Sequence, residues 1–124
     1  MSEKTLHKSV CDYLRLQYPS VIFNTDLSGI KMTIGQSVQV KNLRSNKGFP
    51  DIVIYEPRGK WHGLFIELKK EGTKLAKKNG EWASEHISEQ VKCMNLLVTK
   101  GYYAIVAIGF QDAKDIIDHY LKLK

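Results

Sequence analysis

The chain has 124 residues, of which 43% are hydrophobic and 26% charged, and its formal net charge is +6 at pH 7. This length and composition predict a soluble globular protein with one domain over residues 1–124, large enough to bury a core without disulfides. No apolar run approaches the roughly 20 residues of a membrane-spanning helix, so we expect no membrane association, and the positive charge suits a polyanionic partner without proving one.

The two cysteines and the first residues indicate a reducing compartment. Cys11 and Cys93 fall within helical patterns, and neither has a second cysteine nearby. We therefore expect buried free thiols and no structural zinc site. The first residues lack the apolar core of a signal peptide, which favours a cytoplasmic protein.

The first segment, residues 2–18, has an apolar repeat near 3.6 residues and predicts a helix with a serine cap. Glu3 lies in the first turn, where the helix dipole favours an acidic side chain. Residues 21–23 predict a short strand, and the turn-rich segment after it contains Asp26 and Ser28. These two side chains either form turns or reach the same end of the sheet as the acidic residues described below.

Residues 34–45 allow either a strand or a helix, and we expect a short helix. In such a helix Lys41 and Arg44 share a face, and Lys47 follows one step later. This basic stripe either flanks a nucleic-acid site or forms a solvated surface.

The centre of the chain predicts a β-hairpin. Asp51 opens the apolar run 52–55, a Pro/Gly turn follows, and a second apolar run leads into Glu67, Leu68 and Lys69. Two β-rich runs around such a turn favour an antiparallel pair, and residues two apart in a strand share a face. Glu67 and Lys69 are therefore expected to meet Asp51 at one end of a small sheet, with Leu68 turned away.

Two carboxylates and an ammonium group in an apolar strand require charge compensation, which a hard divalent cation provides. Mg²⁺ binds one or two carboxylates and shares its other positions with water and phosphate oxygens, where it can activate water and stabilise charge on phosphate. The alternative is an aspartate at a strand start beside a Glu–Lys pair on a solvated edge. Spacing alone leaves both interpretations open.

The segment 69–82 predicts a basic loop beside this site. Its lysines would contact phosphates and make binding strongly salt-dependent; they are Lys70, Lys74, Lys77 and Lys78. Trp82 either stacks on a base or anchors the loop to the core, and we expect the anchoring role. His62, at the hairpin turn, is not expected to bind metal.

The last third predicts a helix over residues 84–100, with Gln90 beside its apolar stripe, and a central buried strand over 102–108. An amphipathic helix follows over about 112–122. Together with the earlier elements, this order predicts a mixed α/β (α+β) domain whose sheet of about four strands is flanked by helices.

The strings KGFPDIVI at residues 47–54 and GLFIELKKEG at residues 63–72 resemble the PD-(D/E)XK nuclease signature, and specifically its VRR-NUC branch. The resemblance extends through Gln90 to the glycine and tyrosine at 101–102, and it covers most of the chain. It implies the αβββαβ core of that fold and a metal-dependent phosphodiesterase.

The resemblance also implies roles for individual residues. Asp51, Glu67 and the backbone carbonyl of Leu68 would bind Mg²⁺ or Mn²⁺, and Lys69 would position or activate the attacking water. Two further residues would lie at the edge of the site, namely Gln90 on the downstream helix and Glu3 on the first helix.

The implied substrate is branched DNA, most specifically a Holliday-type four-way junction, in a bacterial or phage-infected cell. A small nuclease without a separate DNA-reading domain can recognise a junction as a symmetric dimer, so we expect a homodimer. The alternatives are a flap-type nuclease and a catalytically silent nucleic-acid-binding module. A sequence-specific endonuclease is disfavoured because no insertion is large enough to read base edges.

Overall fold

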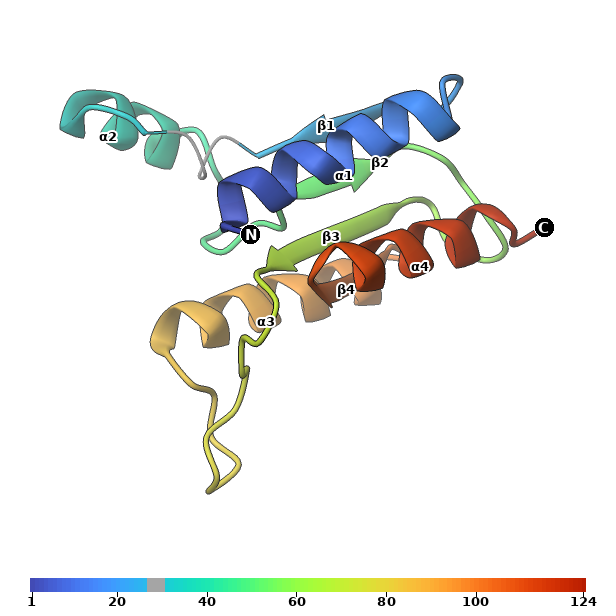
Figure 1. The fold of residues 1–124 in the computed structure, drawn as a ribbon. Coiled ribbons are helices and arrows are strands. Elements are labelled where there is room, and N and C mark those ends of the chain that lie inside the picture. The colour runs from blue at the N-terminus through green and yellow to red at the C-terminus, as the bar shows by residue number, and fades with distance from the viewer. Residues whose placement is uncertain (27–30) are drawn as a thin grey trace.

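The computed structural model describes residues 1–26 and 31–124, and within these ranges a four-stranded mixed sheet lies between helices (Figure 1). The elements in chain order are α1 (Glu3–Gln17), β1 (Phe23–Thr25), α2 (Ile34–Asn42), β2 (Ile52–Ile54), β3 (Leu64–Lys69), α3 (Glu85–Thr99), β4 (Tyr103–Ile108) and α4 (Phe110–Leu121). The predicted mixed α/β class, with a sheet of about four strands flanked by helices, is confirmed.

The sheet has the spatial order β1-β2-β3-β4. β1 pairs with β2 and β2 with β3 in antiparallel fashion, whereas β3 and β4 are parallel and are connected through α3. Ile52 is opposite Ile66 in the β2–β3 pair. The predicted hairpin is therefore present, and its register places the residue before Ile52 opposite the residue after Ile66.

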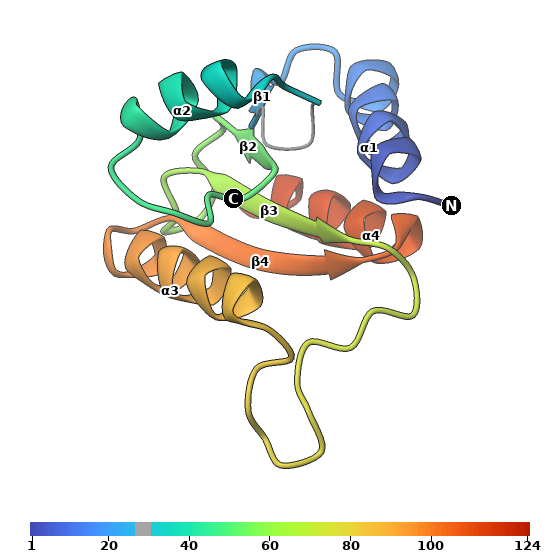
Figure 2. The ribbon, with the colours of Figure 1, turned by 90° about the vertical axis from the view of Figure 1, so that its left-hand side faces the viewer.

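Side chains of β3 alternate between two different environments. Leu64, Ile66 and Leu68 are buried in the main hydrophobic core, which α1 and α4 complete from one side (Figures 1 and 2). The neighbouring residues Glu67 and Lys69 point to the other face, where α3 lies. The predicted separation of Leu68 from its two charged neighbours is confirmed.

Hydrogen bonds from side chains fix where three helices begin. The Ser2 hydroxyl accepts from the Thr5 backbone N–H, and the Ser84 hydroxyl accepts from that of Ile87, each at 3.1 Å. Thr33 forms a reciprocal capping box at the start of α2. Such caps satisfy backbone donors that have no partner within the helix, so the predicted starts of the helices at 2–18, 34–45 and 84–100 are confirmed to within one residue.

Two strand predictions need correction. The first strand occupies Phe23–Thr25 instead of 21–23, because the chain extends only where β2 lies opposite it. The apolar run at 102–108 was expected to be a central strand, but β4 is at the end of the strand order. Its apolar composition arises because α3 and α4 cover its two faces, and composition cannot distinguish such a strand from a central one.

The final helix begins at Phe110, two residues before its predicted start. Gly109 adopts a φ of 87° directly after β4 and lets the chain enter the helix at once. Cys11 and Cys93 are buried free thiols, as predicted. None of the helices in the described ranges has the length and apolar character of a bilayer span.

A hydrogen-bond cluster joins α1 to α4. The Tyr13 and Tyr18 hydroxyls donate to Asp118 Oδ1 at 2.5 and 2.6 Å, and Lys114 Nζ lies 3.0 Å from Asp118 Oδ2. Partial burial acts to raise the pKa of Asp118, but the hydrogen bonds from these three residues outweigh it and lower that pKa to about 2. The ionised carboxylate therefore stabilises the contact between the two helices.

We predict that Asp118→Asn lowers the free energy of unfolding at pH 7 by about 2 kcal/mol, because two hydroxyls lose a charged acceptor. The folded-state pKa lies below the ordinary value of 3.8, so this stabilisation is complete above about pH 4 and is lost as the pH falls towards 2. Urea unfolding across this pH range measures the difference between wild type and variant. Asp115→Asn, at an exposed position on the same helix, is the control, and a difference that stays constant with pH contradicts the assignment.

Candidate active site

The hairpin brings the predicted acidic residues together at one end of the sheet. Asp51 directly precedes β2, and Glu67 and Lys69 lie near the end of β3. The Asp51 Oδ2 atom accepts a hydrogen bond of 2.7 Å from the Leu68 backbone N–H. This bond ties the start of β2 to the end of β3 beyond the last paired residues of the two strands.

The same bond defines the direction of the Leu68 carbonyl. The N–H and C=O groups of one strand residue point towards the same neighbouring strand. The Leu68 carbonyl therefore faces the side on which Asp51 lies, and both residues line a cavity of about 670 Å³. This direction is compatible with the predicted role of the carbonyl as a cation ligand.

Glu67 is only 3% exposed, although it carries a carboxyl group. Its Oε1 atom accepts from Gln90 Nε2 at 3.0 Å and lies 3.9 Å from Lys69 Nζ, while its Oε2 atom has no hydrogen-bond partner. Burial is the main cause that raises the pKa of Glu67 to about 9, and the nearby negative charge of Asp51 raises it further. The nearby ammonium group of Lys69 opposes this shift but does not cancel it.

Close packing of the loop before Asp51 against α3 positions Gln90. Gly48 has a φ of +74°, and a Cβ atom built there would lie 2.8 Å from both the Gln90 nitrogen and the Glu89 carbonyl carbon. Only glycine permits this conformation and this approach together. The glycine of the KGFPD string therefore allows α3 to reach the acidic cluster.

Glu3 and Gln90, the two residues predicted at the edge of the site, both line one cavity with the acidic residues. Gln90 is 6% exposed and contacts Glu67 directly. Glu3 is exposed in the first turn of α1, but it lines a second cavity of about 220 Å³ together with Asp51, Glu67 and Lys69. Its charge also contributes to the raised pKa of Glu67.

Asp26 and Arg44 form an ion pair beside this smaller cavity. Arg44 Nη2 lies 2.6 Å from Asp26 Oδ1, and the Asp26 backbone N–H donates to the Asp51 carbonyl. Helix α2 ends at Asn42, so the prediction that Lys41 and Arg44 share a helical face is wrong. Arg44 instead follows the helix and turns towards Asp26, while Lys41 and Lys47 are exposed. Ser28, the other polar candidate from this region, lies outside the described residues.

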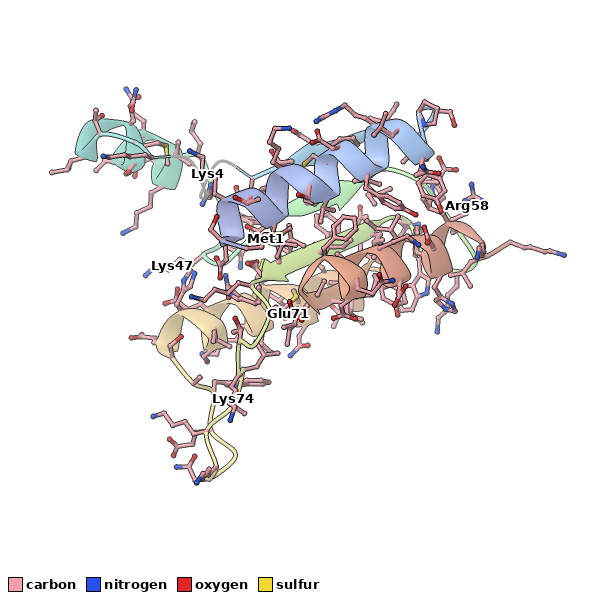
Figure 3. All side chains as sticks on the ribbon, viewed as in Figure 1. Met1, Lys4, Lys47, Arg58, Glu71 and Lys74 are labelled. Carbon is pink, nitrogen blue, oxygen red and sulfur yellow. The ribbon has the colours of Figure 1, made fainter. Side chains whose placement is uncertain are left out.

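The predicted basic loop extends away from the sheet between β3 and α3 (Figures 1 and 2). Its four lysines are exposed, namely Lys70, Lys74, Lys77 and Lys78. Figure 3 shows Lys4, Lys47 and Lys74 at the same end of the molecule as the end of β3, with Arg58 at the opposite end. Cationic side chains from three segments therefore lie at the end of the molecule that carries the acidic cluster.

Trp82 in the basic loop and His62 at the hairpin turn have different surroundings. Trp82 is 44% exposed, and its backbone bridges Ala76 within the loop, so the expected anchoring of Trp82 in the core is wrong. Its exposed ring leaves the stacking role as a prediction. The His62 ring lies at the hairpin turn, packed edge-on against Tyr102 at 5.6 Å.

One residue of the site was missed in the sequence. His86 lines the smaller cavity, and its Nε2 atom lies 3.1 Å from Gln90 Nε2. The spacing between His86 and Gln90 could have revealed it, because residues i and i+4 of a helix are neighbours on its surface. That signal has meaning only once Gln90 is recognised as part of the site.

The donor set fits a hard divalent cation. Within the described ranges, no three histidine, cysteine, aspartate or glutamate side chains form a ready-made metal cage. The site instead offers two adjacent carboxylates, and both Glu67 Oε2 and Gln90 Oε1 are buried oxygens without a hydrogen-bond partner. Such a sparse oxygen set matches Mg²⁺, which retains several waters and uses few protein ligands.

Comparison with known structures supports the same fold. The chain is similar to a structure described as a "VRR_NUC domain protein", with a TM-score of 0.71 and 23% identity, over 99% of this chain and 90% of that one. A second structure, described as a "VRR_NUC domain", gives a TM-score of 0.51 and 19% identity over 93% and 97% of the two chains. No family model matches the chain, and no curated protein matches its sequence. The chain therefore has the fold of VRR_NUC domain structures, as the motif predicted.

We predict that Gly48→Ala lowers the free energy of unfolding by roughly 2–4 kcal/mol, because it adds both a strained backbone conformation and a steric clash with α3. Chemical denaturation measures the effect. The matched control is Gly35→Ala in α2, where a Cβ atom meets nothing within 4 Å and is expected to be neutral or stabilising by up to about 1 kcal/mol. Equal stability of Gly48→Ala and wild type would show that the loop does not pack against α3 as described.

Proposed function

We propose that this chain is a metal-dependent DNA endonuclease that hydrolyses phosphodiester bonds in branched DNA, with four-way junctions as the preferred substrate. The observation that carries the proposal is the buried carboxyl group of Glu67, which lies beside Asp51 and Lys69 and has one oxygen without a partner. A purely structural strand has no use for such a group, whereas a cation-assisted phosphate site requires it. The shared fold with VRR_NUC domain structures supports the same class of activity.

In this proposal the cation is held by Asp51, Glu67 and the Leu68 carbonyl. A bound Mg²⁺ or Mn²⁺ supplies positive charge that polarises the phosphate and stabilises the leaving oxygen. The protein contributes by fixing its own ligands, since Asp51 is held by the Leu68 N–H and Glu67 by the Gln90 amide.

Lys69 has two roles in the proposed reaction. Its ammonium group lies within 3.9 Å of Glu67 Oε1 and lines the same cavity, so it can orient the attacking water and stabilise negative charge on the transition state. The exposed lysines at this end of the molecule would bind the phosphates on either side of the cut. Such contacts make affinity fall steeply as salt rises.

We predict that end-labelled four-way junctions are nicked symmetrically in Mg²⁺ or Mn²⁺, and that Lys69→Ala reduces the cleavage rate at least about 100-fold, because a positioned charge and proton donor is lost. Asp51→Ala is expected to have a similar effect. Circular dichroism confirms that each variant folds, and Lys100→Ala, an exposed lysine at the far end of α3, is the control.

The substrate panel separates the alternatives for this site. A 5′ flap, a 3′ flap and a linear duplex are tested beside the junction. Cleavage of flaps alone supports the proposed nuclease activity and shows that flaps, instead of junctions, are the substrate. Binding of all four DNAs without cleavage in either metal indicates a silent nucleic-acid-binding module, and unchanged cleavage by Lys69→Ala removes the assigned role of that lysine.

Symmetric cleavage of two junction strands requires two active sites, and α2 offers a surface through which two copies can associate. No residue of α2 is buried; its first residue, Ile34, is 87% exposed, and Leu43, the capping residue directly after the helix, is 85% exposed. A nine-residue helix is only marginally stable without packing partners, and α2 lies beyond the rest of the described chain (Figure 1). We therefore propose that α2 packs against a second copy of this chain.

We predict that the wild-type protein is a dimer at micromolar concentration and that combined Ile34→Asp and Val38→Asp substitutions make it monomeric, because both side chains lie on one face of α2 and would bring charge into the contact. Sedimentation or light scattering measures the mass. Leu16→Asp, at an apolar position on α1 that is 78% exposed, is the control. If the wild-type protein has the mass of a monomer, the proposed α2 interface is wrong, and there is no longer a reason to prefer junctions over flaps.

A further inference from the structure

The proposed reaction gives no role to His86 and uses Gln90 only to hold Glu67. Both lie on α3, one turn apart, at the wall of the smaller cavity. The Gln90 amide nitrogen lies 3.0 Å from Glu67 Oε1 and 3.1 Å from His86 Nε2. The Gln90 Oε1 atom is buried and has no hydrogen-bond partner.

These contacts fix the direction of the Gln90 amide. A primary amide carries two N–H donors on its nitrogen and only acceptor capacity on its oxygen. When Glu67 is ionised, as a cation ligand must be, its Oε1 atom and an unprotonated His86 Nε2 atom are both acceptors, so together they bind both N–H groups. Rotating the amide by half a turn would place its oxygen against two acceptors, which is unfavourable.

His86 provides the second of these two restraints. With only the Glu67 contact, one N–H group remains free, and the amide keeps some freedom to turn. With His86 Nε2 as a second acceptor, both donors are used on one side, and the oxygen faces the other side. This arrangement requires the tautomer of His86 that carries its proton on Nδ1.

We propose that His86 is a positioning residue that holds the Gln90 amide so that Oε1 faces the cavity, where this oxygen joins Glu67 Oε2 in the donor set for a divalent cation. The inference deepens the proposed function and rests on it for the identity of the ligand. Mg²⁺ and Mn²⁺ prefer oxygen ligands, and a turned amide would present N–H groups to the cation instead. The neutral oxygen completes the cation site without adding a third negative charge to the Asp51–Glu67 pair.

Two variants separate positioning from other roles of the imidazole. His86→Gln can place a carbonyl oxygen near the position of Nε2 and keeps an acceptor there, whereas His86→Phe keeps the ring shape and removes the acceptor. His86 is exposed, so both variants are expected to fold, which circular dichroism verifies.

The first measurement is isothermal titration calorimetry, in which each protein is titrated with Mn²⁺ alone. We expect His86→Phe to bind Mn²⁺ roughly three- to tenfold more weakly than wild type, the effect of losing one neutral hydrogen bond, and His86→Gln to restore most of the affinity. Equal affinity in all three proteins overturns the proposal. Equal loss in both variants also overturns it, because the imidazole itself is then required.

The second measurement is nuclear magnetic resonance of the metal-free protein, which does not depend on nuclease activity. Long-range ¹H–¹⁵N spectra of wild type are expected to show His86 Nε2 unprotonated, and the Gln90 side-chain N–H groups are expected to exchange faster in His86→Phe than in wild type or His86→Gln. A protonated Nε2, or unchanged exchange in His86→Phe, overturns the positioning role. If the positioning signals appear but wild type binds no Mn²⁺, the proposed function fails and the cation part of this inference fails with it.

Discussion

The carboxyl group of Glu67 is buried beside Asp51 and Lys69, and the elements around it hold it away from water. Removing a carboxylate from water costs several kcal/mol unless charge and hydrogen bonds compensate it. Here the compensation is incomplete, because one oxygen accepts from Gln90, the ammonium group of Lys69 is 3.9 Å away, and the second oxygen has no partner. The pKa of about 9 expresses the same imbalance, which the neighbouring Asp51 increases. The missing compensation is what makes the site suitable for a cation.

Contacts on both faces and both edges of β3 hold Glu67 in its buried position. On one face, Leu64, Ile66 and Leu68 anchor the strand in the core, which keeps Glu67 from turning out to solvent. One edge pairs with β2 and brings in Asp51, and the other pairs with β4, whose connection through α3 brings in Gln90. A strand shared between an antiparallel hairpin and a parallel βαβ unit can therefore collect polar groups from distant parts of the chain.

The sequence predicted the parts of this arrangement that local patterns determine. Alternation along residues 63–69 and the Pro/Gly turn determine the hairpin, and serine caps determine where α1 and α3 begin. The place of β4 in the sheet could not be predicted, because helices on both faces make an edge strand as apolar as a central one. The Arg44–Asp26 pair and the exposure of Trp82 depend on the path of the chain after α2 and after β3, which local patterns do not determine. His86 was missed because a single histidine near a helix start has no pattern until its neighbour is assigned.

Gly48 belongs to the short sequence motif and also allows the loop before Asp51 to pack against α3. In a linear motif this glycine looks like an ordinary turn residue, but its Cβ would collide with the backbone of α3. The absence of a side chain there lets the loop that carries Asp51 and the helix that carries Gln90 approach the same carboxyl group. A cation at this point would bind oxygens from the start of β2, from β3 and from α3, and would thereby join the elements that Gly48 allows to meet. The elements that would hold the cation are therefore the same elements that the absence of a side chain at Gly48 allows to pack together.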